Sequence, residues 1–197
     1  TGFVSTPAYY DNITITNVQG LNPGTGTAQT LYEDAINLLA NQDEYDINLL
    51  LMPGITIEGE SAIVQKAVDM CESRADAFYI ADAGLYGKTV SQITGYAESI
   101  DTNYASVYWP WVQIQDSQIG RLRWVPPSVV LPSVYAFNDK VAQPWFAPAG
   151  LNRGGIDVAI QAERKLTHGN RDDLYDSNVN PIATFPGQGV VVFGQKT

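Results

Sequence analysis

The stretch DINLLLMPG, residues 46–54, is a continuous apolar run that a Pro-Gly pair closes. A run of this kind is typical of a strand buried on both faces of a sheet. ADAFYIADAG at 75–84 repeats the pattern, and YASVYWPWVQIQ at 104–115 is apolar enough to form a third strand. The three runs therefore predict buried strands with helices over both faces.

Helical periodicity fills the intervals between these runs. Apolar side chains recur there three or four residues apart, which places them on one face of a helix. A first helix is expected after a capping box of Thr30 and Glu33. The residues expected on the three helical faces are Leu31, Ala35, Leu38 and Leu39, then Ile63, Ala67, Met70 and Cys71, and then Val90, Ile93, Ala97 and Ile100.

This alternation of strands and helices predicts an α/β fold with a mainly parallel or mixed β-sheet flanked by helices. We expect an extended N-terminal segment and a C-terminal strand as well. A length of 197 residues suits one domain, and 45% hydrophobic residues are enough for a packed core. Residues 1–26, rich in Gly, Pro and Asn, are expected to form an extended arm or linker, and residues 27–197 the α/β core domain.

Charge and cysteine content exclude several classes of protein. Residues 1–104 hold 14 acidic and 3 basic side chains and residues 105–197 hold 7 and 8, so no concentrated basic face can neutralise nucleic-acid phosphates. The acidic half is either a solvated surface or a docking face for a basic partner. One cysteine excludes an internal disulfide and a Cys-based zinc site, and a reducing cytoplasm suits synthesis. No apolar stretch approaches the roughly 18 residues of a membrane helix, so no membrane insertion is expected.

The carboxyl ends of the strands are where α/β folds bind ligands, and one carboxylate stands there. Asp82 could ligate a metal or act as a base, or it could be a helix cap or turn residue. His168, the only histidine, precedes a glycine that predicts a helix C-terminus, and no oriented partner for catalysis is evident. No Walker, dinucleotide-binding or nucleophile-elbow motif occurs. We therefore expect no catalytic, cofactor or metal site.

The aromatic side chains of the middle of the chain also have two interpretations. Trp109 and Trp111 are two residues apart and would share one face of a single strand. Such a face could bind sugars or bases, but it would equally pack in the core or at a subunit interface. The core or interface interpretation is favoured.

The final stretch TFPGQGVVVFGQKT, residues 184–197, is either a phosphate-binding loop or a strand. A phosphate loop leads from a strand into a helix, whereas Gly187 and Gly189 precede apolar residues of a strand. The glycines therefore predict a turn, and the residues after them predict a strand that enters or edges the sheet. Because an edge strand can pair with another chain, the candidates for a subunit interface are Val190, Val191, Val192 and Phe193.

Two long segments carry a resemblance to a known family. The first is WVPPSVVLPSVYAFNDKVAQPWFAPAGLNRGG at 124–155, with Pro126-Pro127-Ser128 before a short helix that is expected to end near Lys140. The second is AERKLTHGNRDDLYDSNVNPIATFPGQGVVVFGQKT at 162–197. Together they resemble the tail sheath proteins of contractile bacteriophage tails and related injection systems, and a weaker resemblance reaches back to about Asp46.

The resemblance implies a structural subunit without enzymatic activity. Such a subunit polymerises around an inner tube and contracts by rigid-body rearrangement, which drives the tube through the host envelope. The implied partners are other sheath subunits, the inner tail tube protein, and the baseplate and tail terminator proteins. The implied location is the phage tail of the virion, after assembly in the host cytoplasm. Two alternatives stay open: an α/β hydrolase that uses Asp82, and a surface-binding module that uses Trp109 and Trp111.

Overall fold

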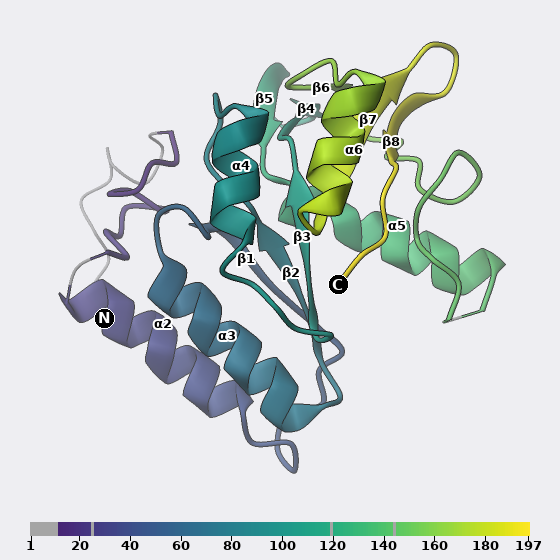
Figure 1. Ribbon diagram of the computed structural model, residues 1–197. Helices are drawn as coiled ribbons and strands as arrows, with labels where there is room; N and C mark the ends of the chain where they lie inside the picture. The colour runs from purple at the N-terminus through teal and green to yellow at the C-terminus, as the bar shows by residue number, and fades with distance from the viewer. Residues whose placement is uncertain (1–11, 25, 119, 144) are drawn as a thin grey trace.

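The apolar runs form the central strands of the molecule. The computed structural model describes residues 12–24, 26–118, 120–143 and 145–197. It places β1 (Leu49–Thr56), β2 (Phe78–Asp82), β3 (Ala105–Trp109), β7 (Val179–Phe185) and β8 (Gly189–Val192) in one sheet, in the order β1-β2-β3-β7-β8 (Figure 1). The first four strands are parallel and β8 is antiparallel to β7. The predicted α/β class, with a mixed sheet and a C-terminal strand, is confirmed.

A second, smaller sheet was not predicted. It consists of β4 (Val112–Asp116), β5 (Arg121–Val125) and β6 (Ala159–Ala162) in the antiparallel order β5-β4-β6. The prediction of one strand over 104–115 is therefore wrong. Pro110 has no N–H to donate to a ladder, and the chain leaves the first sheet there, so that β3 and β4 belong to different sheets.

Helices cover both faces of the five-stranded sheet. The alternation of side chains along the strands separates two apolar clusters, because Leu50 and Tyr79 face one side and Leu51 and Ile80 the other. The first cluster contains residues of the helices on one side, and the second contains residues of α5 and of the small sheet. The helices among the described residues are α2 (Gly26–Leu39), α3 (Ser61–Arg74), α4 (Val90–Ala97), α5 (Pro127–Val141) and α6 (His168–Asp176).

The predicted faces of α3 and α4 are confirmed. Ile63, Ala67, Met70 and Cys71 are all buried in the first cluster, where burial raises the pKa of the Cys71 thiol to about 11. Ile93 and Ala97 are buried too, while Val90 and Ile100 are partly buried against the same cluster. The 3.6-residue period therefore located the buried side of these helices correctly.

The prediction for the first helix is wrong in its start and in most of its face. The described helix begins at Gly26, so Thr30 lies inside it and its hydroxyl donates to the Gly26 carbonyl rather than capping the helix. Ala28 and Ile36 are its buried residues. Of the predicted face, Leu31, Ala35 and Leu38 are exposed, and Leu39 is partly buried against the first cluster. The helix packs mainly on α3, so the side that it buries is the one facing that helix.

Strand β1 does not end at the Pro-Gly pair as predicted. It continues through Pro53 and Gly54 to Thr56, with an irregular register between Leu51 and Thr56. Gly54 has φ +97°, and a Cβ there would lie 3.0 Å from Cγ1 of Val18. A glycine at this position thus lets the strand bend while the N-terminal segment packs closely on it.

The predicted N-terminal arm falls only partly within the described residues. Residues 1–11 and 25 lie outside them, and residues 12–24 form turns with isolated bridges between Thr14 and Asn17 and between Val18 and Leu21. The boundary between an arm at 1–26 and a core at 27–197 stays a prediction. Of the helices in the described part of the chain, none is long and apolar enough to cross a membrane.

Candidate subunit interface

The C-terminal strand β8 carries the predicted interface residues. It forms the predicted edge of the five-stranded sheet, and Gly187 and Gly189, with φ of +76° and +78°, form the turn that joins it to β7. Val190, Val191 and Val192 are buried, and the side chain of Phe193, just after the strand, is 42% exposed. Of the four candidates, Phe193 is therefore the one whose side chain is exposed enough to contact another subunit.

The outer edge of β8 is paired within the chain. The Val190 carbonyl accepts a hydrogen bond from the N–H of Ile156 at 2.8 Å, and the Val192 N–H donates to the Gly154 carbonyl at 2.7 Å. Gly154 is needed for this approach, since a Cβ there would lie 2.5 Å from the Val192 carbonyl oxygen. The segment 150–156 thus occupies the edge that a strand from another chain would use.

Phe193 belongs to a small aromatic cluster beside this edge. Its ring centroid lies 5.0 Å from that of Phe185, and the guanidinium carbon of Arg171 lies 5.5 Å from the Phe193 centroid and 5.3 Å from the Phe185 centroid. An Arg over two aromatic faces is held by their quadrupoles. The cluster therefore presents an ordered apolar and cationic surface.

The residues after Phe193 are fixed to the sheet by two buried side chains. Asn180, in β7, donates from Nδ2 to the Lys196 carbonyl at 2.8 Å and accepts at Oδ1 from the Lys196 N–H at 2.6 Å. The Ser106 hydroxyl of β3 donates to the same carbonyl at 2.7 Å. The Asn180 amide thus forms the pair of hydrogen bonds that a neighbouring strand's backbone would form. Together with Ser106 it holds the residues around Lys196 against β3 and β7.

Asp82 serves the fold as a cap. Its carboxylate is 1% exposed and accepts hydrogen bonds from the Ser128 N–H at 2.9 Å and from the Ser128 hydroxyl at 2.6 Å. Ser128 lies in the first turn of α5, whose unpaired N–H groups and dipole favour an anion. Burial nevertheless raises the pKa of the Asp82 carboxyl to about 7. Of the two interpretations of Asp82, helix cap and catalytic carboxylate, the structure supports the first.

His168 does not end a helix, as predicted, but begins one. Thr167 is the N-cap of α6 and forms a capping box with Asn170. The exposed ring of His168 contacts the Asp172 carboxylate, with Nδ1 2.7 Å from Oδ2, one turn further along the helix. The glycine that follows His168 is not a stop signal, because the cap at Thr167 starts the helix before it.

The tryptophans do not share a face, contrary to prediction. Trp109 is fully buried in β3 within the first cluster, and Trp111 is buried in the link between the two sheets with its Nε1 donating to the Gly84 carbonyl at 2.8 Å. The turn at Pro110 separates the two side chains. Both are core residues, in agreement with the favoured interpretation.

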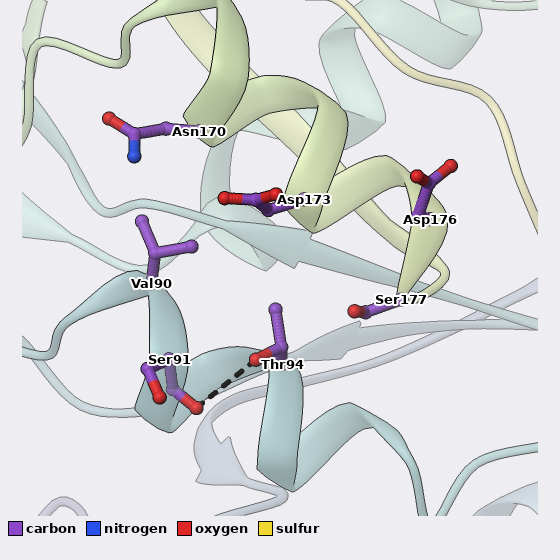
Figure 2. A pocket seen from close by; sticks show the side chains of 7 residues that line it. All are labelled: Val90, Ser91, Thr94, Asn170, Asp173, Asp176 and Ser177. Carbon is purple, nitrogen blue, oxygen red and sulfur yellow. Dashed lines mark hydrogen bonds between the residues drawn. The ribbon is translucent and has the colours of Figure 1, made fainter.

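A polar groove lies between α4 and α6 (Figure 2). Its volume is about 460 Å³, and its walls carry hydroxyl, amide and carboxylate groups. Figure 2 shows Asp173 projecting over the groove from α6, opposite Ser91 and Thr94 of α4. Its lining residues are Val90, Ser91, Thr94, Asn170, Asp173, Asp176 and Ser177.

Comparison with known proteins assigns the family. The model of the phage tail sheath protein central domain matches residues 30–197. The chain belongs to the phage tail sheath protein family. The match covers α3 to α6, both sheets and most of α2, so the family assignment rests on the whole core rather than on one motif.

Curated relatives agree with this assignment. The tail sheath protein of Vibrio phage KVP40 is 34% identical over 125 residues, which cover 56% of this chain and 19% of the relative. The tail sheath protein of Enterobacteria phage T4 is 26% identical over 198 residues, which cover 87% of this chain and 29% of the relative. This sheath chain thus spans less than a third of the length of these two relatives.

Solved structures share the fold. One is the baseplate of the anti-feeding prophage, with a TM-score of 0.67 and 21% identity over 88% of this chain and 43% of the matched chain. Another is the helical sheath of the same system in its contracted state, with a TM-score of 0.59, 21% identity, and coverage of 88% and 44%. At this level of identity they show that the sheath chain has the same fold.

Two features of the molecule escaped the sequence interpretation. The outward stripes of α2 and α5 are apolar, and a helical wheel of 127–141 could have revealed this because its apolar residues surround the helix. The hydrogen bond between the Asn180 side chain and the Lys196 backbone could not be predicted from the sequence. A side-chain amide that pairs with a backbone group 16 residues away leaves no local sequence pattern.

Proposed function

We propose that this chain is a structural part of a contractile tail sheath, which polymerises around an inner tube and contracts to drive that tube through the host envelope. The observation that carries the proposal is the match of the sheath central domain to residues 30–197. Sequence similarity to the tail sheath proteins of two phages supports the proposal, and so does the similarity of the fold to a contracted helical sheath.

A sheath that contracts by rearrangement needs rigid subunits, and the core meets this requirement. Two apolar clusters pack on opposite faces of one sheet, and the second cluster also includes Val112 and Ala162 of the small sheet. Close packing of this kind resists deformation, so subunits move as bodies. The free energy of contraction then comes from the difference between two packings of the same subunits.

The structural role also accounts for the chemistry of Asp82. The sheath function uses the fold as scaffold and needs no reaction, so we propose that the chain is not an enzyme. Asp82 and its partner Ser128 position α5, which is a structural task. For the hydrolase alternative, the Asp82 carboxylate would have to break its hydrogen bonds with Ser128 in order to reach a substrate.

The proposed partners follow from the same role. They are other sheath subunits, the baseplate, the inner tail tube protein and the tail terminator protein, in the virion tail after assembly in the host cytoplasm. The baseplate is supported by a solved baseplate chain of the same fold. Val190, Val191, Val192 and Phe193 stay proposed interface residues, with Phe193 at the surface and the valines reachable only if the segment 150–156 leaves the edge of β8.

Electron microscopy tests the proposal directly. The protein expressed from its complete coding sequence is purified with and without co-expressed tube protein and examined by negative staining. Hollow tubes of a constant width, or a second population of wider and shorter tubes, are expected. A protein that stays monomeric in both preparations over a wide range of concentration would overturn the proposal.

A further inference from the structure

Helix α5 presents an apolar surface on both of its sides. Its inner residues Val130, Leu131 and Val134 are buried against the sheet. Its outer residues Val129 and Phe137 are 43% and 48% exposed, and the same row continues to Val141. These residues lie on one row of the helix spaced by multiples of four, in which the exposed Ser133 stands between Val129 and Phe137 and donates its hydroxyl to the Val130 carbonyl. A helix that only covers a sheet needs no such outer ridge.

The loop after α5 extends this apolar surface. Trp145 is 79% exposed and stacks on Phe146 with ring centroids 6.4 Å apart. The loop is held in place, because Asn138 of α5 donates to the Phe146 carbonyl at 3.0 Å and the Arg153 guanidinium lies 4.7 Å from the Phe146 ring. We call Val129, Phe137, Val141 and Trp145 the α5 face. An ordered tryptophan so exposed is typical of a contact residue.

Helix α2 has a second such surface. Leu31 and Leu38 are 52% and 55% exposed, and the exposed Ala35 lies between them. We call Leu31, Ala35 and Leu38 the α2 face. In the described structure α2 packs on α3 through its opposite side, and Ala28 and Ile36 are its buried residues. The α2 face therefore points away from the molecule.

The two faces lie on opposite sides of the molecule. Residues of α2 and α3 belong to the first apolar cluster, whereas those of α5 belong to the second, across the five-stranded sheet. Figure 1 shows α2 and α5 at the two flanks, with the sheet between them. A surface on one side that fits a surface on the other makes a heterologous contact, and repetition of such a contact builds an open helical array.

Charge and shape favour the same pairing. Residues 26–48, which contain α2 and its following loop, hold Glu33, Asp34, Asp43, Glu44 and Asp46 and no Lys or Arg. Residues 127–153 hold Lys140 and Arg153 against one acidic residue. Opposite charges around apolar stripes set partner choice and register. The small Ala35 of one helix also leaves a groove into which a ridge containing Phe137 fits.

We propose that the α5 face of one copy packs on the α2 face of a second copy of this chain. The inference rests on the proposed function, since it assumes that copies assemble. Specific interfaces bury about 1,200 Å² or more in total, so this contact is one joint among several. It gives the sheath an apolar, charge-matched joint that runs through the core domain itself.

Cysteine cross-linking tests the joint. Within these 197 residues the one cysteine, Cys71, is buried, and any cysteine elsewhere in the complete protein is first replaced by serine, so that an introduced thiol at the surface reports on its own position. Two single variants, Leu38→Cys and Phe137→Cys, are made in the protein expressed from its complete coding sequence and allowed to co-assemble before mild oxidation. Both positions are exposed, so the variants should fold, and circular dichroism confirms this. The control pair joins Phe137→Cys with Ser91→Cys, an exposed position on α4.

The expected result is a cross-linked dimer of Leu38→Cys with Phe137→Cys, in about tenfold excess over either homotypic dimer and over the control pair. A chain that carries both substitutions should give a ladder of higher oligomers. Tubes that form normally without the heterotypic product would overturn this joint and leave the proposed function standing. A protein that forms no tubes at all would overturn both proposals.

Discussion

At the scale of single residues, burial decides what the charged groups do. Asp82 and Glu60 lie near the carboxyl ends of β1 and β2, and burial is the largest cause that raises the pKa of each carboxyl to about 7. Hydrogen bonds from Ser128 to Asp82 and from the Thr56 N–H to Glu60 oppose this rise. Each carboxyl is therefore partly protonated at neutral pH, and its full ionisation within the fold lowers stability.

This arrangement predicts a stability that falls as the pH rises. A folded pKa of about 7 lies above the ordinary pKa values of 3.8 for Asp82 and 4.5 for Glu60, so between these values the folded state binds more protons than the unfolded state. The contribution of these two groups to the free energy of unfolding should decrease from about pH 4 to about pH 7, by at most about 4 kcal/mol for Asp82 and about 3 kcal/mol for Glu60. Urea titrations at several pH values measure this slope.

Asp82→Asn should remove part of this slope, because asparagine keeps an acceptor for the Ser128 N–H but does not ionise. The melting temperature at pH 8 should then rise relative to the parent chain. Asp101→Asn, at an exposed loop position, is the matched control and should leave the slope unchanged. An unchanged slope in Asp82→Asn would mean that the charge of Asp82 does not limit stability.

At the scale of elements, the edge of β8 depends on a backbone contact that only glycine permits. Gly154 lies against β8, and a Cβ there would be 2.5 Å from the Val192 carbonyl oxygen and 2.8 Å from the Gly150 nitrogen. Both neighbours are backbone atoms, so the strand itself would have to move. The segment 150–156 would then lose hydrogen bonds that close the edge.

Gly154→Ala is accordingly expected to destabilise the fold by about 2–4 kcal/mol, as overpacking and lost backbone hydrogen bonds do. Gly95→Ala is the matched control, because Gly95 lies within α4 and a Cβ there would meet nothing within 4 Å. It should stabilise the chain by about 0.5–1 kcal/mol, since alanine is the better helix former. Urea midpoints compare the two, and equal midpoints would contradict the tight packing of Gly154.

At the scale of the whole molecule, the two sheets share one core. The second apolar cluster joins Val112 and Ala162 of the small sheet to Leu131 of α5 and to Ile182 and Val192 of the large sheet. No part of this cluster is complete without both sheets. A rigid sheath subunit requires such coupling, since a loosely attached sheet would absorb the motion that contraction must transmit.

The 197-residue chain is therefore expected to unfold in one cooperative transition. Circular dichroism reports the helices, and fluorescence reports the four tryptophans, of which Trp109 and Trp111 are buried at the junction of the two sheets and Trp124 lies in β5 of the small sheet. The two urea curves should coincide. Separate midpoints for the two probes would show that the small sheet unfolds independently and would contradict a single rigid core.

The sequence predicts the helices and strands of the fold better than the contacts between them. The helical period located the buried sides of α3 and α4 because a helix that covers a sheet buries one side. It misplaced the buried side of α2, because that helix packs on another helix and leaves Leu31 and Leu38 outside. Of the candidate interface, it indicated the edge strand β8 but could not show the segment that pairs with it.

What the sequence by itself determined is the α/β class, the presence of buried strands in the apolar runs 46–54 and 75–84, and the turn before β8, since apolar runs and glycine turns are local signals. Only the tertiary structure decided that β3 and β4 enter different sheets, that Asp82 caps a helix 46 residues further along the chain, and that the segment 150–156 closes the edge. The physical reason is that each of these contacts joins groups far apart in the chain. Their stability depends on what the whole fold brings together, which no local pattern records.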